Sequence, residues 1–278
     1  MKFYLGTANF NIKYGIGGHK VNNLEIKKIL EFCSKKKINL FDTSIEYKNL
    51  EVIKKIKKII KEPKVFLKLK LIRDKKIINI KQSIELINVV LKKFPKIYCL
   101  MLHDLNDLKC KNFNTFFAAL LNFKNNGFKK IGISIYEPTD LNIIYKKKIH
   151  FDYIQIPYSI FNQNFTNLNT KKLRTSGVKF LARSIFLQGV IFNNKKFKNW
   201  LYLKKKLVEI KSLYNYSLSF IFINFVRNTK WLSGIVFGVN DKNNLLEIFK
   251  YFHSKNKLFF NKKNFRIKNK KIIDPRKW

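Results

Sequence analysis

Short runs of apolar residues alternate along the chain with segments in which apolar residues recur every three or four positions. The first pattern is typical of buried strands and the second of amphipathic helices. The two patterns repeat about every 25 to 35 residues, which predicts a regular succession of strand and helix units. The apolar runs predict strands at residues 2–8, 39–43, 65–69, 97–103, 130–135, 153–157, 180–184 and 232–238.

Helical patterns fill the segments between these runs. Pro63 and Pro95 are expected to end two helices, because proline cannot continue a helix, and Gly127 and Gly177 are expected to end two more. The predicted helices cover residues 24–36, 50–61, 78–94, 113–126, 201–213, 217–227 and 243–252, and another begins at Pro138. Residues 164–176 are expected to form a helix or an irregular segment. A lysine-rich, mostly irregular tail is expected from about residue 255.

Nearly continuous apolar strands that alternate with helices indicate a parallel sheet buried on both faces. Eight such units in 278 residues favour one closed (β/α)8 TIM barrel, an α/β fold, over an open sheet or two ordinary domains. The glycines at positions 15, 17 and 18 lack the spacing of a G-x-G-x-x-G turn, which argues against a Rossmann fold. We therefore expect a single domain over residues 1–278.

Four polar side chains are expected at the carboxyl ends of three strands. Asp42 lies near the end of the second strand and Tyr47 in the loop after it. Lys68 lies near the end of the third strand, and His103 closes the fourth. In a barrel these ends share one mouth, where a carboxylate, a phenol, an amine and an imidazole make a general acid–base site. Lys70, two residues after Lys68 on the same strand face, is the alternative amine.

The formal charge of +41 and the pI near 10.1 are values common in nucleic-acid-binding proteins. The excess is mostly lysine, and it accompanies many asparagine, isoleucine and phenylalanine residues, which share A/T-rich codons. Many lysines also fall on the polar faces of helical patterns, as at positions 54, 55, 57, 58 and 61. We interpret the charge as compositional and expect no nucleic-acid partner, with a polyanion-binding surface as the alternative.

The cysteines Cys33, Cys99 and Cys110 form no CxxC pair and are odd in number, which is typical of a reduced, cytoplasmic protein. No signal-peptide pattern precedes the first strand. No apolar run approaches the ~18 residues of a membrane helix. The apolar segment 218–226 contains a serine and an asparagine, so we expect a core helix there.

Several short motifs occur in a consistent order from Leu5 to about Glu247. They are LGTANF from Leu5 with Tyr14-Gly15, Phe41-Asp42-Thr43 with Tyr47 and Glu51, KVFLKL from Lys64, Leu102-His103-Asp104, IGISIY from Ile131, QIPY from Gln155 and RSIFLQG from Arg183. Together they resemble the aldo-keto reductase family. QIPYSIFNQ and RSIFLQG are most similar to bacterial members associated with surface-polysaccharide gene clusters.

The resemblance implies an NAD(P)H-dependent oxidoreductase that reduces the carbonyl group of an aldehyde, a ketone or a sugar-type substrate to an alcohol. The nicotinamide supplies the hydride, and the protein supplies orientation and a proton. Tyr47 would donate the proton, and the ammonium of Lys68 would lower the Tyr47 pKa from its usual value of about 10. Asp42 would pair with Lys68, and His103 would orient the carbonyl oxygen.

The resemblance also implies which residues hold the nicotinamide half of the cofactor. Ser134 and Gln155 are expected to hold the carboxamide. Arg183 or Tyr158 is expected to lie against the ring, because guanidinium and phenol groups stack on flat π systems. Ser184 follows Arg183 in the same motif and is expected to contact the cofactor.

The phosphate half is expected to lie at the start of the last helix. Gly238 and that helix would bind phosphate through backbone N–H groups. Lys242 would favour the 2′-phosphate of NADPH, and Asn244 belongs to the same motif. NADPH is the expected cofactor, with NADH as the alternative. The other histidines have no metal-ligand spacing, so no metal site is predicted.

Three positions depart from the family pattern. Lys48 and Leu50 stand where the family usually has glycine and serine, and Leu67 stands where a small polar residue usually precedes the lysine. Two other functions therefore stay open. One is a lyase or epimerase acting on a sugar or phosphorylated substrate, and the other is a basic barrel that binds a polyanion with degenerate chemistry.

Overall fold

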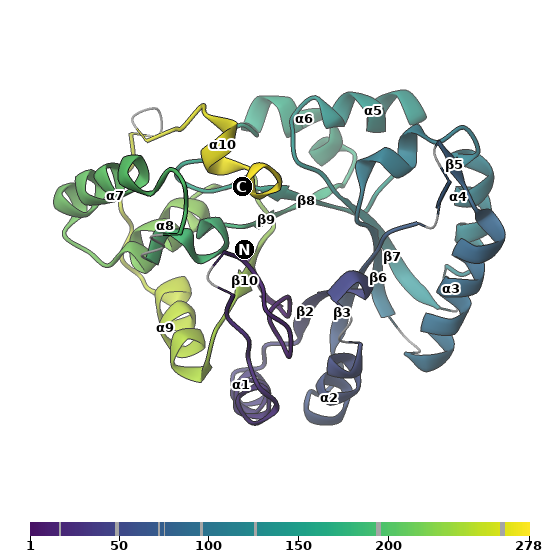
Figure 1. Cartoon of the computed structure of the whole chain (residues 1–278), viewed down its shortest axis with the longest axis horizontal. Coiled ribbons are helices and arrows are strands. Elements are labelled where there is room, and N and C mark those ends of the chain that lie inside the picture. Colours follow the sequence, from purple (N-terminus) through teal and green to yellow (C-terminus); the bar gives the residue numbers. More distant parts are fainter. Residues whose placement is uncertain are drawn as a thin grey trace.

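The computed structural model describes the chain except for residues 17, 48–49, 72, 75, 95–96, 125–126, 193–195 and 262–264. Its parallel strands close into a barrel in the order β1-β10-β9-β8-β7-β6-β3-β2, with helices around the ring (Figure 1). The strands are β1 Lys2–Gly6, β2 Leu40–Ser44, β3 Lys64–Leu69, β6 Ile97–Leu102, β7 Phe128–Ser134, β8 Tyr153–Pro157, β9 Lys179–Arg183 and β10 Gly234–Gly238. The predicted (β/α)8 barrel is confirmed.

The barrel closes between its first and last strands. Lys2 of β1 lies in register with Gly234 of β10, and Leu5 lies in register with Phe41 of β2. Glycine is required at position 234, since a Cβ atom there would lie 2.4 Å from the ring of Tyr4. Tyr4 belongs to a buried cluster that is separate from the main core, together with Phe66, Cys99, Met101, Tyr153 and Leu181. Side chains of different sizes from five strands thus pack together in one small core.

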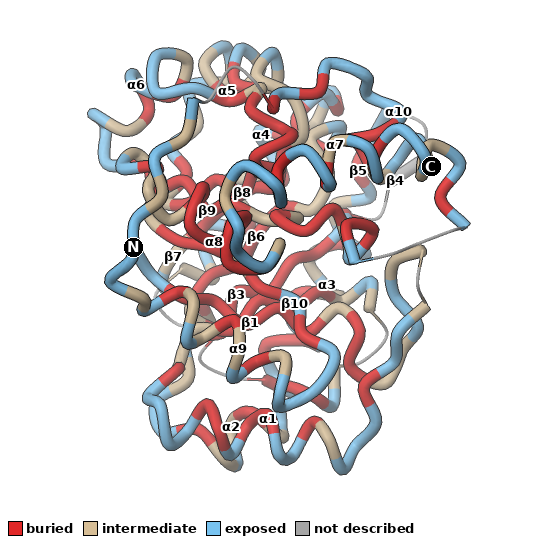
Figure 2. Tube along the Cα trace, turned by 90° about the vertical axis from the view of Figure 1, so that its left-hand side faces the viewer, coloured by how far each residue is buried: buried red, intermediate tan, exposed pale blue. Residues whose placement is uncertain are grey.

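The helices bury one face each against the sheet, and buried residues follow the strands and the inner turns of the helices (Figure 2). The helices are α1 Asn23–Lys35, α2 Glu51–Ile59, α3 Ile80–Lys93, α4 Phe113–Leu121, α5 Asp140–Lys147, α6 Asn167–Thr175, α7 Trp200–Tyr214, α8 Leu218–Arg227, α9 Lys242–His253 and α10 Lys270–Ile273. Helix α8 is buried on almost every side, as expected for a core helix. Within the described residues, no helix combines the length and the apolar character needed to cross a membrane.

Two elements of the fold differ from the sequence-based expectation. Helix α4 ends at Leu121, because the chain turns through hydrogen bonds from the backbone N–H groups of Phe123 and Lys124. A short antiparallel hairpin, β4 Arg73–Asp74 with β5 Ile77–Ile78, precedes α3 and was not predicted. The predicted helix end at Pro95 lies outside the described residues.

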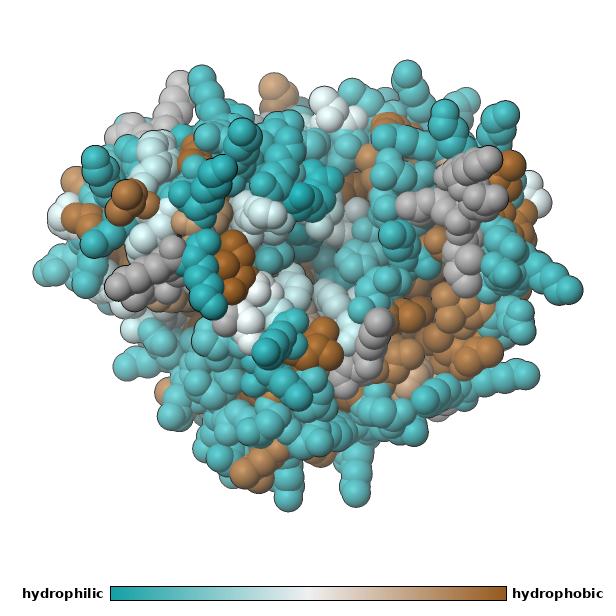
Figure 3. Space-filling model, in the orientation of Figure 1, coloured by the Kyte–Doolittle hydropathy of each residue, from teal (hydrophilic) through white to brown (hydrophobic). Residues whose placement is uncertain are grey.

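The tail after α9 folds back onto the barrel instead of trailing into solvent. It contains α10 and a short 3-10 helix, η4 Pro275–Lys277, which lie over the ring of strands in Figure 1. Lys270 forms an ion pair of 3.1 Å with Glu137, and the ring of Trp278 lies 5.2 Å from that of Phe197. Figure 3 shows hydrophilic side chains around the rim of this face and a hollow near its centre.

Candidate active site

The carboxyl ends of β2 and β3 hold a buried ion pair. Lys68 Nζ lies 2.5 Å from Asp42 Oδ1, and each side chain is 4% exposed. Burial disfavours the charged ammonium, but the negative charge and hydrogen bond of Asp42 together with the phenol of Tyr47 outweigh it, so the pKa of Lys68 is raised. The alternative amine, Lys70, is exposed. The geometry therefore supports Lys68 over Lys70 as the amine of the site.

Asp42 has a second partner on the other side of the barrel. The side-chain amide of Gln155, from β8, donates a hydrogen bond to Asp42 Oδ2. Gln155 is fully buried, and its carbonyl oxygen Oε1 has no hydrogen-bond partner. Both oxygens of the carboxylate are therefore held, and one buried acceptor is left over at the base of the site.

Tyr47 ends a 3-10 helix, η1 Ile45–Tyr47, that directly follows β2. Lys68 Nζ lies 5.6 Å from the centre of the Tyr47 ring. Burial raises the pKa of Tyr47, while the positive charge of Lys68 acts most strongly in the opposite direction. Lys68 therefore lowers the pKa of Tyr47 as expected, but desolvation of the phenol raises this pKa by more.

His103 follows β6 and lies with its ring 6.4 Å from that of Tyr47, at 89° between the two planes. Burial and then the charge of Lys68 lower the pKa of His103 to about 3. The imidazole is therefore neutral at neutral pH, so it can donate a hydrogen bond but is no proton reservoir. His103 Nδ1 lies 3.2 Å from Ser44 Oγ, and the Ser44 hydroxyl donates to the backbone oxygen of Lys68 at 3.2 Å.

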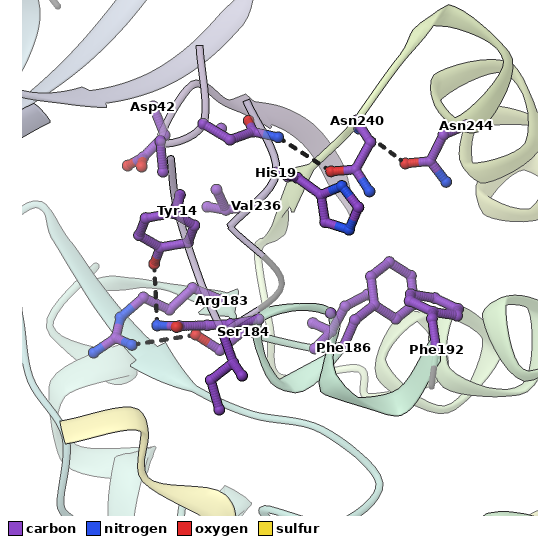
Figure 4. Close-up of a pocket in the computed structure, with 18 of the residues that line it drawn as sticks. Tyr14, His19, Asp42, Arg183, Ser184, Phe186, Phe192, Val236, Asn240 and Asn244 are labelled. Carbon is purple, nitrogen blue, oxygen red and sulfur yellow. Dashed lines mark hydrogen bonds between the residues drawn. The ribbon is translucent and has the colours of Figure 1, made fainter. Parts of the chain in front are cut away.

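These four side chains line one cavity of about 920 Å³. Of the eight residues predicted to bind a cofactor, five line the same cavity: Ser134, Arg183, Ser184, Gly238 and Asn244. Figure 4 shows Asp42, Arg183 and Ser184 on one side of the cavity, and Asn240 with Asn244 on another. The cavity therefore joins the acid–base group to the turn between β10 and α9.

Arg183 is fixed at the end of β9 by three hydrogen bonds. Its guanidinium donates to Ser134 Oγ and to the backbone oxygen of Ile135, both at 3.2 Å, and to Ser184 Oγ at 3.5 Å. The guanidinium also lies 4.2 Å from the centre of the Tyr136 ring. Ser134 and Arg183 are thus in contact at the ends of β7 and β9.

Three predicted cofactor residues do not line the cavity. Tyr158 is 3% exposed and packs in the core, 5.9 Å from the ring of Phe225. Gln155 lies beneath the cavity and contacts Asp42. Lys242 has an exposed side chain, and its backbone N–H donates to Glu25 Oε1 at 2.8 Å.

Two loops that line the cavity contact each other. Gln188 Nε2 donates to Tyr14 Oη at 3.1 Å, as the dashed line in Figure 4 marks. Gly15 has φ of +70°, and a Cβ atom there would lie 2.9 Å from the backbone oxygen of Gln188. Ser184, Leu187 and Gln188 also adopt positive φ, a conformation that costs energy for non-glycine residues. The loop after β9 is therefore strained where it borders the cavity.

Sequence reasoning missed several residues of the site. Ser44, Tyr136 and Arg276 were not singled out, although Tyr136 ends the IGISIY motif and Ser44 directly follows Phe41-Asp42-Thr43. The guanidinium of Arg276 lies 3.6 Å from the centre of the Tyr136 ring, so the tail reaches the site. The folded tail brings Arg276 to Tyr136 across 140 positions of the chain. In the described part of the chain, no group of three or more His, Cys, Asp or Glu side chains is arranged to hold a metal ion.

Comparison with protein families gives a match over residues 2–261 to the aldo/keto reductase family. The chain belongs to this family. Membership supports an oxidoreductase that acts on a small-molecule carbonyl compound. A search of curated proteins finds no match.

Solved aldo-keto reductases share the fold at low sequence identity. The aldo-keto reductase AKR11C1 from Bacillus halodurans, in its holo form, superposes with a TM-score of 0.69 at 14% identity, over 93% of this chain and 88% of that one. The glycerol dehydrogenase AKR11B4 from Gluconobacter oxydans gives a TM-score of 0.69 at 16% identity, over 94% and 88%. At these identities the similarity establishes the barrel alone.

Proposed function

We propose that this protein is an NAD(P)H-dependent carbonyl reductase, with Tyr47 as its proton donor. The observation that carries the proposal is the buried Asp42–Lys68 ion pair, which lies beside Tyr47 and His103 at the mouth of the barrel. Burial of two charged groups carries a desolvation cost. We therefore assign this ion pair a role in function. A phenol, an ammonium and a neutral imidazole in one cavity form a site for carbonyl reduction.

The cavity fits a nicotinamide dinucleotide. Its volume of about 920 Å³ is at the upper end of the range for cofactor sites. Gln155 does not line the cavity, but it holds Asp42, which does, and Asp42 in turn holds Lys68 at the nicotinamide end. Ser134 and Arg183 would hold the same end, and Gly238 leaves open space where a side chain would intrude. Tyr158 lies in the core, so we leave it out of the proposed cofactor site.

A bound nicotinamide would supply the hydride, and the side chains would manage the proton and the carbonyl oxygen. Neutral His103 would lie beside the carbonyl oxygen and orient it. Tyr47 would then give its proton to that oxygen. The Lys68 ammonium would stabilise the phenolate left behind, and Asp42 would keep Lys68 in place.

The substrate would extend into a second cavity, which adjoins the first at His103 and Tyr136. This cavity, of about 460 Å³, is lined almost entirely by polar and charged residues, among them Glu46, Lys70 and Asn106. Such walls suit a hydroxylated carbonyl compound better than an apolar one. The likeness of two motifs to members from surface-polysaccharide gene clusters supports a sugar-type substrate.

Titration with NADPH and with NADH, followed by nicotinamide fluorescence, tests the proposal. A carbonyl reductase binds at least one of them with a saturable signal, and aldehydes then oxidise the bound dinucleotide. A lyase, an epimerase or a polyanion binder binds neither dinucleotide specifically, and that result would reject the proposal.

We also propose a cytoplasmic location and a single domain over residues 1–278. Three unpaired, buried cysteines support the first, because disulfides are rare in a reducing compartment. The packing of the tail onto the barrel supports the second.

A further inference from the structure

We propose that the cavity selects NADH over NADPH, because its end beside α9 presents carboxylates and other acceptors where the 2′-phosphate of NADPH would lie. This inference rests on the proposed function. It concerns a preference that the family resemblance leaves open, and it opposes the expectation that Lys242 favours NADPH.

The direction of the bound dinucleotide follows from the shape of the cavity. The nicotinamide must lie beside Tyr47 and Lys68, at the ends of β2 and β3. From there the large cavity extends to the turn between β10 and α9, where Asn240 and Asp241 line it. The adenosine half, including the ribose that carries the 2′ substituent, therefore lies at this end.

The charges of this end are unfavourable for a phosphate dianion. Asp241 and Glu247 line it, together with the neutral Asn240 and Asn244. Lys242, in contrast, has an exposed side chain and does not line the cavity. Lys196, from the loop after β9, also lines the cavity. A cation that contacts the pyrophosphate, which both dinucleotides share, does not discriminate between them.

The N-terminus of α9 is already bonded to carboxylates of the protein itself. The Lys242 N–H donates to Glu25 Oε1 at 2.8 Å, and the Asn244 N–H donates to Asp241 Oδ1 at 2.7 Å. Free N–H groups at a helix start are what usually holds a phosphate. The hydrogen bond from Lys242 holds the pKa of Glu25 below its usual value, so this carboxylate stays charged at neutral pH. A 2′-phosphate would have to compete with two carboxylates for these donors.

The side-chain oxygen of Asn9, at the same end of the cavity, is a buried acceptor without a hydrogen-bond donor. Asn9 lines the cavity and is 6% exposed, and its amide nitrogen donates to the backbone oxygen of Val239 at 2.8 Å. Its carbonyl oxygen Oδ1 is buried without a hydrogen-bond partner. A ribose 2′-hydroxyl can donate to such an oxygen or to a carboxylate, whereas a phosphate dianion only accepts. The end beside α9 is therefore complementary to NADH.

Equilibrium binding separates this inference from the proposed function. We would titrate the protein with NADH, NADPH, ADP-ribose and 2′-phospho-ADP-ribose at about 0.15 M salt, where general attraction by the basic surface is largely screened. We expect the forms without the 2′-phosphate to bind about tenfold more tightly, or more. If neither dinucleotide binds, the proposed function fails. If NADPH binds as tightly as NADH, or more tightly, only the selectivity inference is overturned.

Charge-neutral variants assign the effect to residues. Asp241→Asn keeps a good helix cap, and Glu25→Gln keeps an acceptor for Lys242 N–H, while each removes one negative charge. Each variant should lower the dissociation constant of NADPH several-fold and leave that of NADH nearly unchanged, so that the preference for NADH becomes smaller. Asn244→Arg, which adds a positive charge, should reduce the preference for NADH further.

The matched control is Glu209→Gln, which removes a carboxylate from α7 that pairs with Lys206. Glu209 does not line the cavity, so this variant should leave the ratio of the two dissociation constants unchanged. Thermal unfolding of each variant checks that it folds. An unchanged ratio in all three variants at the start of α9, with folding intact, would overturn the assignment.

Discussion

The side-chain amide of Gln155 on β8 donates a hydrogen bond to Oδ2 of Asp42 on β2, so one bond spans the barrel. In the ring order β2-β1-β10-β9-β8 these strands stand four places apart, which is the greatest separation in a ring of eight. Lys68 holds the other oxygen of the same carboxylate. Asp42 therefore links its neighbouring strand to the strand on the opposite side of the barrel.

Replacement of Gln155 by methionine should lower both the stability and the affinity for dinucleotide. The change removes a buried hydrogen bond to a charged group, which costs about 1–3 kcal/mol in the free energy of unfolding. Urea denaturation measures that loss. The control is Gln163→Met, because Gln163 is also buried and donates to the backbone oxygen of Ile160. Gln163→Met should destabilise the fold but leave dinucleotide affinity unchanged. Equal affinity losses in both variants would mean that Gln155 has only a structural role.

Replacement of Tyr47 by phenylalanine should abolish most carbonyl reduction and leave dinucleotide affinity nearly unchanged. Positioned general acids contribute about 10²–10⁴-fold to the rate, and this variant removes the acid. Steady-state turnover on a panel of aldehydes, with fluorescence titration of the dinucleotide, measures the two effects separately.

The variant Lys68→Met should lose activity by a related route, because the phenolate of Tyr47 then loses its stabilising charge. The two losses should not multiply in the double variant, since both residues act on one proton transfer. Full turnover of Tyr47→Phe on every substrate of the parent protein would show that another group donates the proton. Multiplying losses in the double variant would show that the two residues act independently.

The stability of the protein should depend on the protonation of His103. The pKa of this imidazole is about 3 in the folded chain, against about 6.5 when unfolded. Between these values the unfolded chain binds a proton that the folded chain does not, so this contribution is fully present above pH 6.5 and is lost as the pH falls. Between about pH 7.5 and 5 we expect a loss of about 1–2 kcal/mol from this residue.

Urea denaturation of His103→Asn at both pH values checks this expectation, because the variant should lose less stability than the parent on acidification. The control is His150→Asn, which replaces an exposed histidine. A parent and a His103→Asn variant with the same pH dependence would contradict the lowered pKa.

Binding to DNA should be weak despite the charge of +41. Non-specific contacts between lysines and phosphates release counterions, so the affinity should fall steeply as the salt concentration rises. Fluorescence anisotropy with a labelled duplex, at about 0.05 and 0.2 M salt, measures this slope. Tight binding that persists at the higher salt, without dinucleotide binding, would favour the polyanion-binding alternative.

The strands could be predicted closely because their signal is local. Tyr153–Pro157 was placed to the residue, and the other barrel strands were placed within about two residues at each end. Strand β10 begins two residues later than predicted, because the backbone N–H of buried Leu232 bonds to Thr229 in a turn. Apolar character indicates burial, but it does not distinguish a strand from the turn that precedes it.

The contacts of the site depend on closure of the barrel, and short-range patterns carry no information on them. The hydrogen bond from Gln155 to Asp42 joins residues 113 positions apart, and that from Lys242 to Glu25 joins residues 217 apart. Motif resemblance placed Asp42 and Lys68 at the ends of adjacent strands. It did not indicate that Gln155 would bind Asp42, or that α9 would receive its anion from α1.

The packing of Arg276 against Tyr136 has a practical consequence for anyone who purifies this protein. An affinity tag fused after Trp278 would extend from a segment that borders the second cavity. A tag before Met1 would extend from the amino end of β1, at the other end of the barrel from the mouth. Kinetic constants should therefore be measured on protein tagged at the amino terminus, or on protein from which a carboxyl-terminal tag has been cleaved.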